Sequence, residues 1–153
     1  MTLREGNLDQ LETRIVCALQ TDARKSFKSI AAELNVSEST ISNRVNRLVQ
    51  NGVLKLEARI NPFKLSHKVT ALVGMNVRHP GHGDTLKKIE ALPHVNAVWV
   101  TTGKYDLFAE VMADSISDLN EFIFGHGLSS MEDITFTETH IMLHSDTKYF
   151  KLS

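Results

Sequence analysis

The sequence predicts an α+β protein in which an N-terminal winged helix-turn-helix, of three helices and a short strand, precedes a C-terminal ferredoxin-like βαββαβ domain. Two observations predict this fold. Apolar residues recur at three- and four-residue steps in the first 50 residues, which is the spacing of amphipathic helices. From residue 68 onward, strand-like and helix-like segments alternate. We therefore expect a helical unit over residues 1–53, a linker strand or wing over 54–67, and a second domain over 68–153.

The first helix is expected from about Asp9 to Thr21. Asn7 is a plausible N-cap, and Asp9 and Glu12 bring negative charge to the first turn, where the helix dipole favours it. Cys17, next to an apolar residue, is expected to be a small buried side chain. The apolar stripe consists of Leu8, Leu11, Ile15 and Leu19.

The second and third helices are expected to follow closely. Ser26 can cap the second helix, and Asn35, which tolerates the left-handed conformation, can end it. Ser37 then caps a helix over residues 38–50, which Asn51 and Gly52 stop. So short a turn between two helices forces a sharp crossing angle, as in a helix-turn-helix. The inward positions of the third helix are Ile41, Val45, Leu48 and Val49.

Residues 54–60 alternate between apolar and polar side chains. Such alternation predicts a strand, here the start of a small wing, and Asn61-Pro62 is expected to end it.

The outward face of the third helix predicts contact with DNA. Hydroxyl groups near a helix N-terminus can meet phosphates and base edges, Asn pairs well with adenine, and Arg pairs well with guanine. Charge agrees in direction, because residues 1–60 hold nine basic and seven acidic residues, whereas residues 61–153 hold eight and eleven. The candidate DNA-binding residues are Ser37, Ser39, Thr40, Asn43, Arg44 and Arg47, with Asn46 near the edge of the face.

The run from residue 8 to residue 65 resembles the feast/famine regulators, the Lrp/AsnC family of bacteria and archaea. This resemblance implies a DNA-binding transcriptional regulator. Two positions depart from the family pattern: Glu12 stands where Asp is usual, and Ser66 stands near a frequent Gly. The matching segments are Leu8-Asp9, Asp22-Ala23-Arg24, Ser26-Phe27, Ile30-Ala31, Val36-Ser37, Ser39-Thr40, Arg44-Val45, Arg47-Leu48 and Gly52-Val53.

The second domain is expected to place two helices on one face of a four-stranded sheet. Asp84 can cap the first of its helices and Ser117 the second. The expected strands are residues 68–78, 95–101, 105–113 and 134–144. The order βαββαβ is that of a ferredoxin-like sheet.

These strands carry apolar residues on both faces, which predicts a homodimer. Leu72, Phe108 and Met112 oppose the residues expected in the core, and a small domain has no third layer to cover them. We place Val100 with Leu72 and Phe108 on the outer face. A two-fold dimer presents two recognition helices to a palindromic operator in double-stranded DNA. The family resemblance further implies tetramers or octamers.

The segment Gly103-Lys104-Tyr105-Asp106 is expected to form a tight hairpin. Gly103 accepts a positive φ, and Asp106 can hold an ammonium group. Spacing alone favours an ordinary hairpin with a surface acid. The resemblance instead implies that a Gly-x-x-Asp hairpin marks an amino-acid-binding domain, with the effector between subunits. It also adds Thr137 and Thr139 from a neighbour. The candidate effector-binding residues are therefore Gly103, Tyr105, Asp106, Thr137 and Thr139, although Tyr105 could instead point into the core.

Metal and nucleotide sites are not expected. The pairs His79/His82 and His140/His144 lack a third ligand at a familiar spacing, and Gly81-x-Gly83 lacks the third glycine of a nucleotide-binding loop. We therefore expect no cofactor, no metal and no catalytic residue.

Two other functions are compatible with this architecture. One is an enzyme similar to siroheme decarboxylases, although residues 95–108 hold a single cation, Lys104. The other is an amino-acid-binding module that has lost DNA binding, against which Asn43, Arg44 and Arg47 argue.

The sequence contains one cysteine, no apolar run near the ~20 residues of a membrane span, and no signal-peptide core. We therefore expect a cytoplasmic protein that does not enter a membrane.

Overall fold

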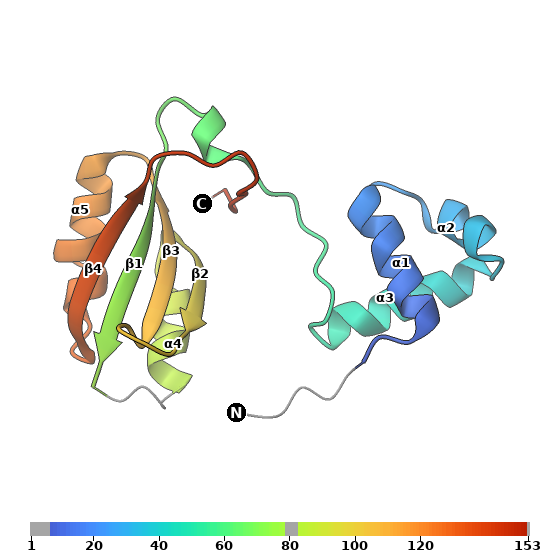
Figure 1. Ribbon diagram of the computed structural model, residues 1–153, viewed down its shortest axis with the longest axis horizontal. Helices are drawn as coiled ribbons and strands as arrows, with labels where there is room; N and C mark the ends of the chain where they lie inside the picture. Colours follow the sequence, from blue (N-terminus) through green and yellow to red (C-terminus); the bar gives the residue numbers. More distant parts are fainter. Residues whose placement is uncertain (1–6, 79–82, 153) are drawn as a thin grey trace. The chain divides into compact units, whose positions relative to one another are not determined.

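The computed structural model describes residues 7–78 and 83–152. The chain divides into two compact units, residues 1–57 and residues 58–153 (Figure 1). The first unit is helical, and the second is an α+β sheet domain. No helix in the described part of the chain is long and apolar enough to cross a membrane.

Three helices build the first unit, as the sequence predicted. They are α1 (Gln10–Thr21), α2 (Phe27–Leu34) and α3 (Glu38–Gln50). Only residues 35–37 separate α2 from α3, which gives the helix-turn-helix arrangement. Each helix contributes two residues to a shared core, made of Ile15, Leu19, Ile30, Ala31, Ile41 and Val45.

Polar side chains fix the ends of these helices. The hydroxyl of Ser26 accepts a hydrogen bond from the N–H of Ser29, and Ser37 caps α3 in the same way. Asn35 ends α2 with a φ of 56°, as expected. The predicted N-cap Asn7 is wrong, because Asp9 caps α1 by accepting from the N–H of Glu12. The helix itself begins at Gln10, within one residue of the expected start at Asp9.

Two residues predicted to be buried within their helices are exposed, and Leu8, predicted for the stripe of the first helix, lies before α1 and is exposed as well. Val49 on α3 and Cys17 on α1 both face solvent. Cys17 lies two residues beyond the fully buried Ile15, and two residues turn an α-helix by about 200°. Val49 directly follows the buried Leu48, and one residue turns an α-helix by about 100°, which brings its side chain toward solvent.

The wing strand predicted over residues 54–60 is absent from the structure. Leu54 packs against the helical core instead, and its N–H donates to the carbonyl of Leu48 at 3.1 Å. The ladder contact described in this segment is an isolated bridge between Ile60 and Phe150. Alternation of side chains gives a strand its two faces, but a strand also needs a partner backbone beside it.

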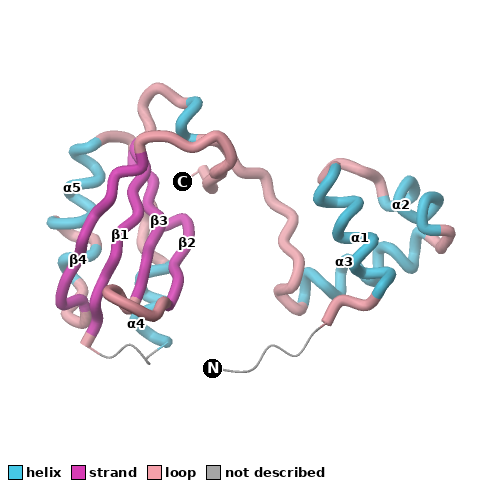
Figure 2. Tube along the Cα trace, viewed as in Figure 1, coloured by secondary structure: helices cyan, strands magenta, loops and turns pink. Residues whose placement is uncertain are grey.

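The second unit is a four-stranded antiparallel sheet in the order β2-β3-β1-β4, with helices inserted as βαββαβ (Figure 2). This order confirms the ferredoxin-like prediction. A short 3₁₀ turn at Pro62–Lys64 precedes the first strand, and another at Leu128–Ser130 precedes the last strand. The elements are β1 (Val69–Val77), α4 (Gly83–Glu90), β2 (Val95–Val100), β3 (Leu107–Ala113), α5 (Ile116–Phe124) and β4 (Ile134–Met142).

One sheet face is covered by α4 and α5. Ile89 of α4 and Phe122 of α5 pack on the alternating core residues of β1 and β3. We refer to the opposite side of the sheet, which carries Leu72, Trp99 and Phe108, as the open face. Val100 does not belong to it, because Val100 pairs with Leu107 and so shares the helix-covered side, where its side chain is exposed. Trp99, paired with Phe108, takes the place predicted for Val100.

Neither predicted cap of the sheet-domain helices stands as predicted. Ser115, not Ser117, caps α5 by accepting from the N–H of Asp118 at 3.0 Å. Asp84 lies inside the first turn of α4, which begins at Gly83. At α5, Ser115 and Ser117 offer similar cap chemistry, and the packing of the helix selects between them.

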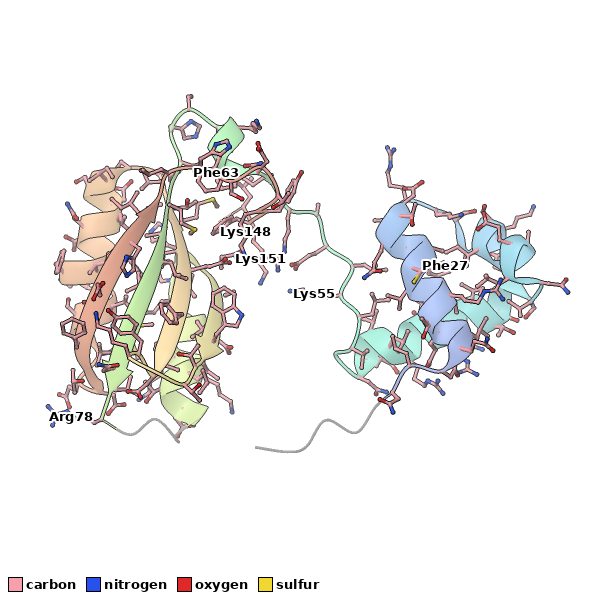
Figure 3. All side chains as sticks on the ribbon, in the orientation of Figure 1. Phe27, Lys55, Phe63, Arg78, Lys148 and Lys151 are labelled. Atoms are coloured by element: carbon pink, nitrogen blue, oxygen red, sulfur yellow. The ribbon has the colours of Figure 1, made fainter. Side chains whose placement is uncertain are left out.

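The C-terminal segment, residues 143–152 after β4, is part of the sheet domain. Phe150 is fully buried, and its backbone exchanges two hydrogen bonds of 2.8 Å with Ile60. Lys148 lies over the Trp99 ring, with 5.5 Å from Nζ to the ring centroid, and pairs with the buried Glu110 (Figure 3). This segment therefore covers part of the open face.

Candidate nucleic-acid interface and ligand hairpin

The exposed side of α3 is polar. Ser39, Asn43 and Asn46 are exposed, one or two turns apart, and Gln50 continues the line at the C-terminal end. Neither α1 nor α2 covers this face, because the helical core of the first unit occupies the opposite side of α3. A polar, uncovered face on the second helix of a helix-turn-helix has the chemistry and shape for contact with a major groove.

Three hydroxyl groups gather at the N-terminus of α3. The Ser37 Oγ lies 2.9 Å from the Ser39 Oγ and 2.8 Å from the Thr40 Oγ1, and it also accepts from the Thr40 N–H. Ser37 is thus occupied as a helix cap. Hydroxyl groups and free N–H groups at a helix N-terminus suit a phosphate oxygen.

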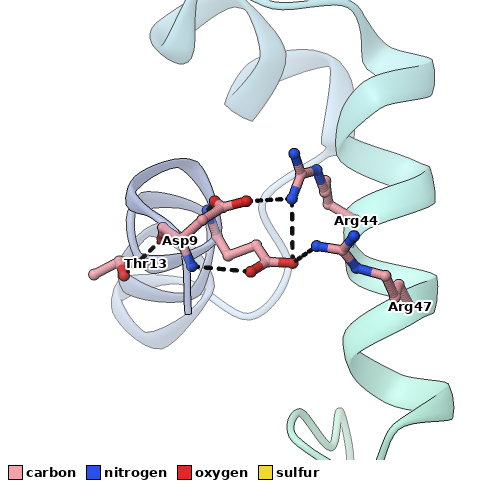
Figure 4. Close-up of polar contacts among 5 residues, drawn as sticks. Asp9, Thr13, Arg44 and Arg47 are labelled. Atoms are coloured by element: carbon pink, nitrogen blue, oxygen red, sulfur yellow. Dashed lines mark hydrogen bonds and ion pairs between the residues drawn. The ribbon is translucent and has the colours of Figure 1, made fainter. Parts of the chain in front are cut away.

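The two predicted DNA-binding arginines contact α1. Arg44 pairs with Asp9 and lies 3.4 Å from Oε1 of Glu12, and Arg47 pairs with the same Glu12 oxygen (Figure 4). Arg44 is half-buried, whereas 54% of the Arg47 side chain is exposed. Arg44 therefore lies on the flank of α3 that faces α1, and Arg47 lies at the border of the exposed face.

These contacts shift the ionisation of the groups involved. Hydrogen bonding lowers the pKa of both carboxyls: the backbone N–H of Glu12 is the main cause for Asp9, and the Arg47 guanidinium for Glu12. The same hydrogen bond to Glu12 raises the pKa of Arg47. Asp9, Glu12 and Arg47 are therefore charged at neutral pH.

The second predicted site is the hairpin between β2 and β3. Gly103 has a φ of 124°, a value that favours glycine, as predicted. The hairpin is closed by Thr101, whose N–H donates to the carbonyl of Asp106 at 2.9 Å and whose hydroxyl donates to the carbonyl of Tyr105 at 2.7 Å.

Asp106 ties this hairpin to the end of β1. Its N–H donates to the carbonyl of Met75 at 3.0 Å, and its Oδ2 accepts from the N–H of Val77 at 3.0 Å. The carboxylate therefore has a structural partner in addition to any ligand that it binds. Its side chain is partly buried, so one side remains accessible.

Tyr105 points to the open face. Its hydroxyl donates to Glu138 of β4, its ring stacks parallel to Phe136 at 6.3 Å between centroids, and its ring edge contacts Gly74. A Cβ at Gly74 would lie 2.7 Å from the tyrosine ring, so only glycine leaves room for it. Lys104 lies above the same ring and pairs with Glu138 at 2.7 Å.

Thr137 and Thr139 lie on the other side of the sheet from Tyr105. Thr137 pairs with Met75 and Thr139 with Val73, and both partners belong to the helix-covered core. Directly paired residues in an antiparallel ladder share a face. Within one chain, the structure brings together Gly103, Tyr105 and Asp106 and keeps the two threonines apart from Tyr105.

Sequence reasoning missed two acidic residues of the open face. Glu138 accepts from Tyr105 and Lys104, its pKa is lowered chiefly by Lys104, and its other oxygen lies 3.1 Å from His140. Glu110 is buried and pairs with Lys148 and with the Asn96 amide. Only the alternation of the strands signals which face these residues occupy, and no spacing in the sequence indicates their partners.

A hollow of about 480 Å³ lies on the open face. Its apolar lining comes from all four strands, and the C-terminal segment forms its polar rim through Ser145 and Lys148. The apolar residues are Leu72, Trp99, Phe108 and Met142.

No group of three His, Cys, Asp or Glu side chains is placed to hold a metal ion among the residues that the structure describes. His79, His82 and Gly81, considered above for a metal site and a nucleotide-binding loop, lie outside those residues. His140 pairs with Glu138, and His144 pairs with Asp146 at 3.4 Å.

Comparison with known proteins matches each of the two units to a known type of domain. Residues 8–55 match a winged helix-turn-helix DNA-binding model, and residues 70–149 match the model of the Lrp/AsnC ligand-binding domain. An HTH-type transcriptional regulator of Pyrococcus furiosus is 36% identical over 136 residues, which are 88% of this chain and 91% of that protein.

Solved structures share the fold. AsnC of E. coli aligns with a TM-score of 0.72 and 29% identity, over 94% of this chain and 97% of that one. A transcriptional regulator of Neisseria meningitidis, solved in complex with L-methionine, aligns with a TM-score of 0.73 and 17% identity, over 96% and 97% of the two chains. The helix-turn-helix, the ferredoxin-like sheet with its Gly103 hairpin, and these matches lead to one conclusion: the chain belongs to the Lrp/AsnC family of transcriptional regulators.

Proposed function

We propose that this regulator reads a DNA operator through α3 and that an amino acid or a related small molecule, bound at the Gly103 hairpin, modulates its assembly or its affinity for DNA. The observation that carries the proposal is the uncovered polar face of α3 in a helix-turn-helix that precedes an Lrp/AsnC ligand-binding domain. Since its ligand is DNA, we place the protein in the cytoplasm.

In the proposed interface, the position of each α3 residue decides whether it suits a contact with a base edge or with a phosphate. Ser39 and Asn43 are exposed near the N-terminal half of the helix, which suits contact with base edges. Ser37 and Thr40, in the hydroxyl cluster, suit a phosphate. Arg44 and Arg47 suit phosphate or base contacts through the guanidinium N–H groups that Asp9 and Glu12 leave free.

The experiment is selection of an operator from a random duplex library, followed by titration of point variants. Asn43→Ala should weaken operator binding by about 1–3 kcal/mol, while binding to random duplex changes little. Lys28→Ala, which removes a charge from α2, is the control for a purely electrostatic effect. Recovery of no preferred sequence by the wild-type protein would refute the proposed function.

We place the effector beside Gly103 and Asp106. The Neisseria meningitidis regulator was solved with L-methionine, and the fold it shares with this chain supports an amino acid as the ligand class. In this proposal, the Gly103 backbone holds the carboxylate of the effector, and Asp106 holds its ammonium group. Thr137 and Thr139 do not share a face with Tyr105, so in our proposal their contribution comes from a neighbouring subunit.

Isothermal calorimetry with each common amino acid tests this site. We expect heat from one or a few of them, and a change in operator affinity caused by the same compounds. A full screen that gives no heat with the assembled protein would overturn the effector proposal and leave DNA binding standing.

We propose a homodimer joined through the open faces, in which a second copy of the chain covers the apolar hollow. Leu72, Trp99, Phe108 and Met142 offer it an apolar surface, and the partner sheet would offer the same one. A dimer also suits a palindromic operator. Pairing of dimers into tetramers or octamers is the larger assembly that we propose. Light scattering at micromolar concentration should find no stable monomer.

We further propose that the chain catalyses no reaction. The relatives that match it are named as transcriptional regulators, and the exposed α3 face is retained. A siroheme-type substrate carries many carboxylates and requires several cations, whereas residues 95–108 contain Lys104 alone, and Lys104 is paired with Glu138. Visible absorption of a tetrapyrrole in the purified protein would contradict this proposal.

A further inference from the structure

Glu12 joins the start of α1 to the recognition helix. One of its oxygens, Oε2, accepts from the N–H of Asp9 at 3.0 Å and completes the capping box of α1. The other, Oε1, pairs with Arg47 and lies 3.4 Å from Arg44 (Figure 4). Both oxygens are therefore engaged, each by a different helix.

The Glu12 carboxylate is held in place. The residue is only 4% exposed, and the capping box fixes it to the first turn of a helix whose next turns carry the buried Ile15 and Leu19. A carboxylate that is fixed in place limits the conformations of a flexible arginine, because the guanidinium N–H groups must stay directed at the carboxylate oxygen. Arg47 is the residue so restricted, and 54% of its side chain is exposed although one of its guanidinium nitrogens is paired with Glu12.

We propose that Glu12 is a positioning residue for operator recognition: it holds Arg47 at the border of the α3 reading face, with the unpaired guanidinium N–H groups directed to the DNA. This inference rests on the proposed DNA binding through α3. Asp9 supports the arrangement by occupying Arg44, which leaves Arg47 as the arginine with the larger exposed side chain.

The proposal predicts opposite effects on two affinities. Loss of the Glu12 charge leaves Arg47 free to sample rotamers, so operator binding must order it again, and the operator preference falls by about two- to tenfold. Loss of the same charge also makes the helical unit more positive. Attraction to any DNA phosphate therefore rises, and random duplex binds equally well or more tightly.

The test uses Glu12→Gln in the full chain. Glutamine also forms a capping box, so the start of α1 can be retained, but its single oxygen cannot serve Asp9 and Arg47 together. Fluorescence anisotropy should be measured with the selected operator and with a random duplex of equal length, at several salt concentrations. Glu33→Gln is the charge-matched control, because Glu33 is an exposed acid of α2 that pairs with Lys25 at 2.6 Å.

We expect Glu12→Gln to lower the ratio of operator to random-duplex affinity, and Glu33→Gln to leave that ratio unchanged. In the Arg47→Ala background, Glu12→Gln should have no further effect on the ratio, since the side chain that it positions is gone. Should Glu12→Gln fail to fold, Glu12→Asp keeps the charge on a shorter arm and should lower the ratio by a smaller factor.

An unchanged ratio in folded Glu12→Gln or Glu12→Asp protein would overturn the inference. Equal losses on operator and random duplex would also overturn it, because they would reveal only general damage to the fold. Neither result touches the proposed function, which fails only when the wild-type protein itself prefers no sequence.

Discussion

The carboxylate of Asp106 accepts a hydrogen bond from the backbone N–H of Val77 at 3.0 Å. The acid that the sequence suggested as a ligand for an ammonium group thus also extends the contact between the hairpin and the end of β1. Removing the side chain therefore tests two roles at once, and the roles must be separated by a variant that keeps one of them.

Asp106→Asn is that variant. Its amide oxygen can still accept from Val77, so we expect a melting temperature close to that of the wild type, whereas the charge that holds an ammonium group is lost. The calorimetric response to the effector should therefore disappear, with operator binding retained. Asp106→Ala should lose both the response and about 1–3 kcal/mol of stability. An Asn variant that responds like the wild type would show that the charge is not used.

Acid should destabilise the helical unit through Asp9 and Glu12. Both carboxyls have pKa values below the ordinary 3.8 and 4.5, so the unfolded chain binds more protons near those values. Their contribution to stability is complete above the ordinary values and is lost as the pH falls through the lowered ones. Thermal unfolding followed by circular dichroism from pH 7 to pH 3 should show a shallower decline for Glu12→Gln. Parallel curves for the two proteins would contradict this.

Phe150→Ala should strongly destabilise the sheet domain. The ring is fully buried and the backbone pairs with Ile60, so truncation leaves a cavity beneath the C-terminal segment. Phe→Ala changes of this kind cost about 3–5 kcal/mol. Leu152→Ala, two residues along the chain and 68% exposed, is the matched control and should be nearly neutral. Denaturant unfolding of both variants measures the difference.

Gly74→Ala should displace the Tyr105 ring. The added methyl group would lie 2.7 Å from the ring, and the ring is held by Phe136 and Glu138, so we expect a loss of about 1–3 kcal/mol. Gly83→Ala, at the start of α4 with no atom within 4 Å of the new Cβ, should be neutral or slightly stabilising. Equal melting temperatures for the two variants would show that the ring moves without cost.

Leu72→Asp should disrupt the proposed homodimer. A carboxylate in the lining of the apolar hollow would be buried in the interface beside Glu110, whose charge already occupies Lys148. Size-exclusion chromatography with light scattering should then find monomers. Phe124→Asp, on the opposite layer and with its side chain 73% exposed, should leave the assembly unchanged. A dimer that persists in Leu72→Asp would place the interface elsewhere.

Much of the fold could be predicted from short stretches of sequence. Ser26, Asn35 and Ser37 act within one helical turn of their own positions, so their cap and stop roles can be inferred without the rest of the chain. The alternation in β1 likewise assigns Val73 and Met75 to the core. Errors arose where two local choices were nearly equal, as with Ser115 and Ser117 at the start of α5.

The candidate sites were predicted less completely. The positive φ of Gly103 could be predicted from the residue type and the expected turn alone, and the structure confirms it. Tyr105, by contrast, stacks on Phe136 and donates to Glu138, more than 30 residues away. No spacing along the chain indicates such partners, because the strand register that joins them is set by the whole sheet.

The sequence by itself determined the helices of the first unit, the order of elements in the second, and the polar character of α3, because capping and apolar periodicity act over a few residues. Only the tertiary structure decided what Arg44 and Arg47 contact. In the sequence of α3 they are simply two arginines. The packing of α1 against α3 brings Asp9 and Glu12, 35 residues earlier in the chain, into contact with them. The same packing leaves the Arg47 side chain more exposed than that of Arg44. Charged side chains are long and their partners are chosen by proximity in space, so their roles follow from the packing of the helices rather than from their own positions in the chain.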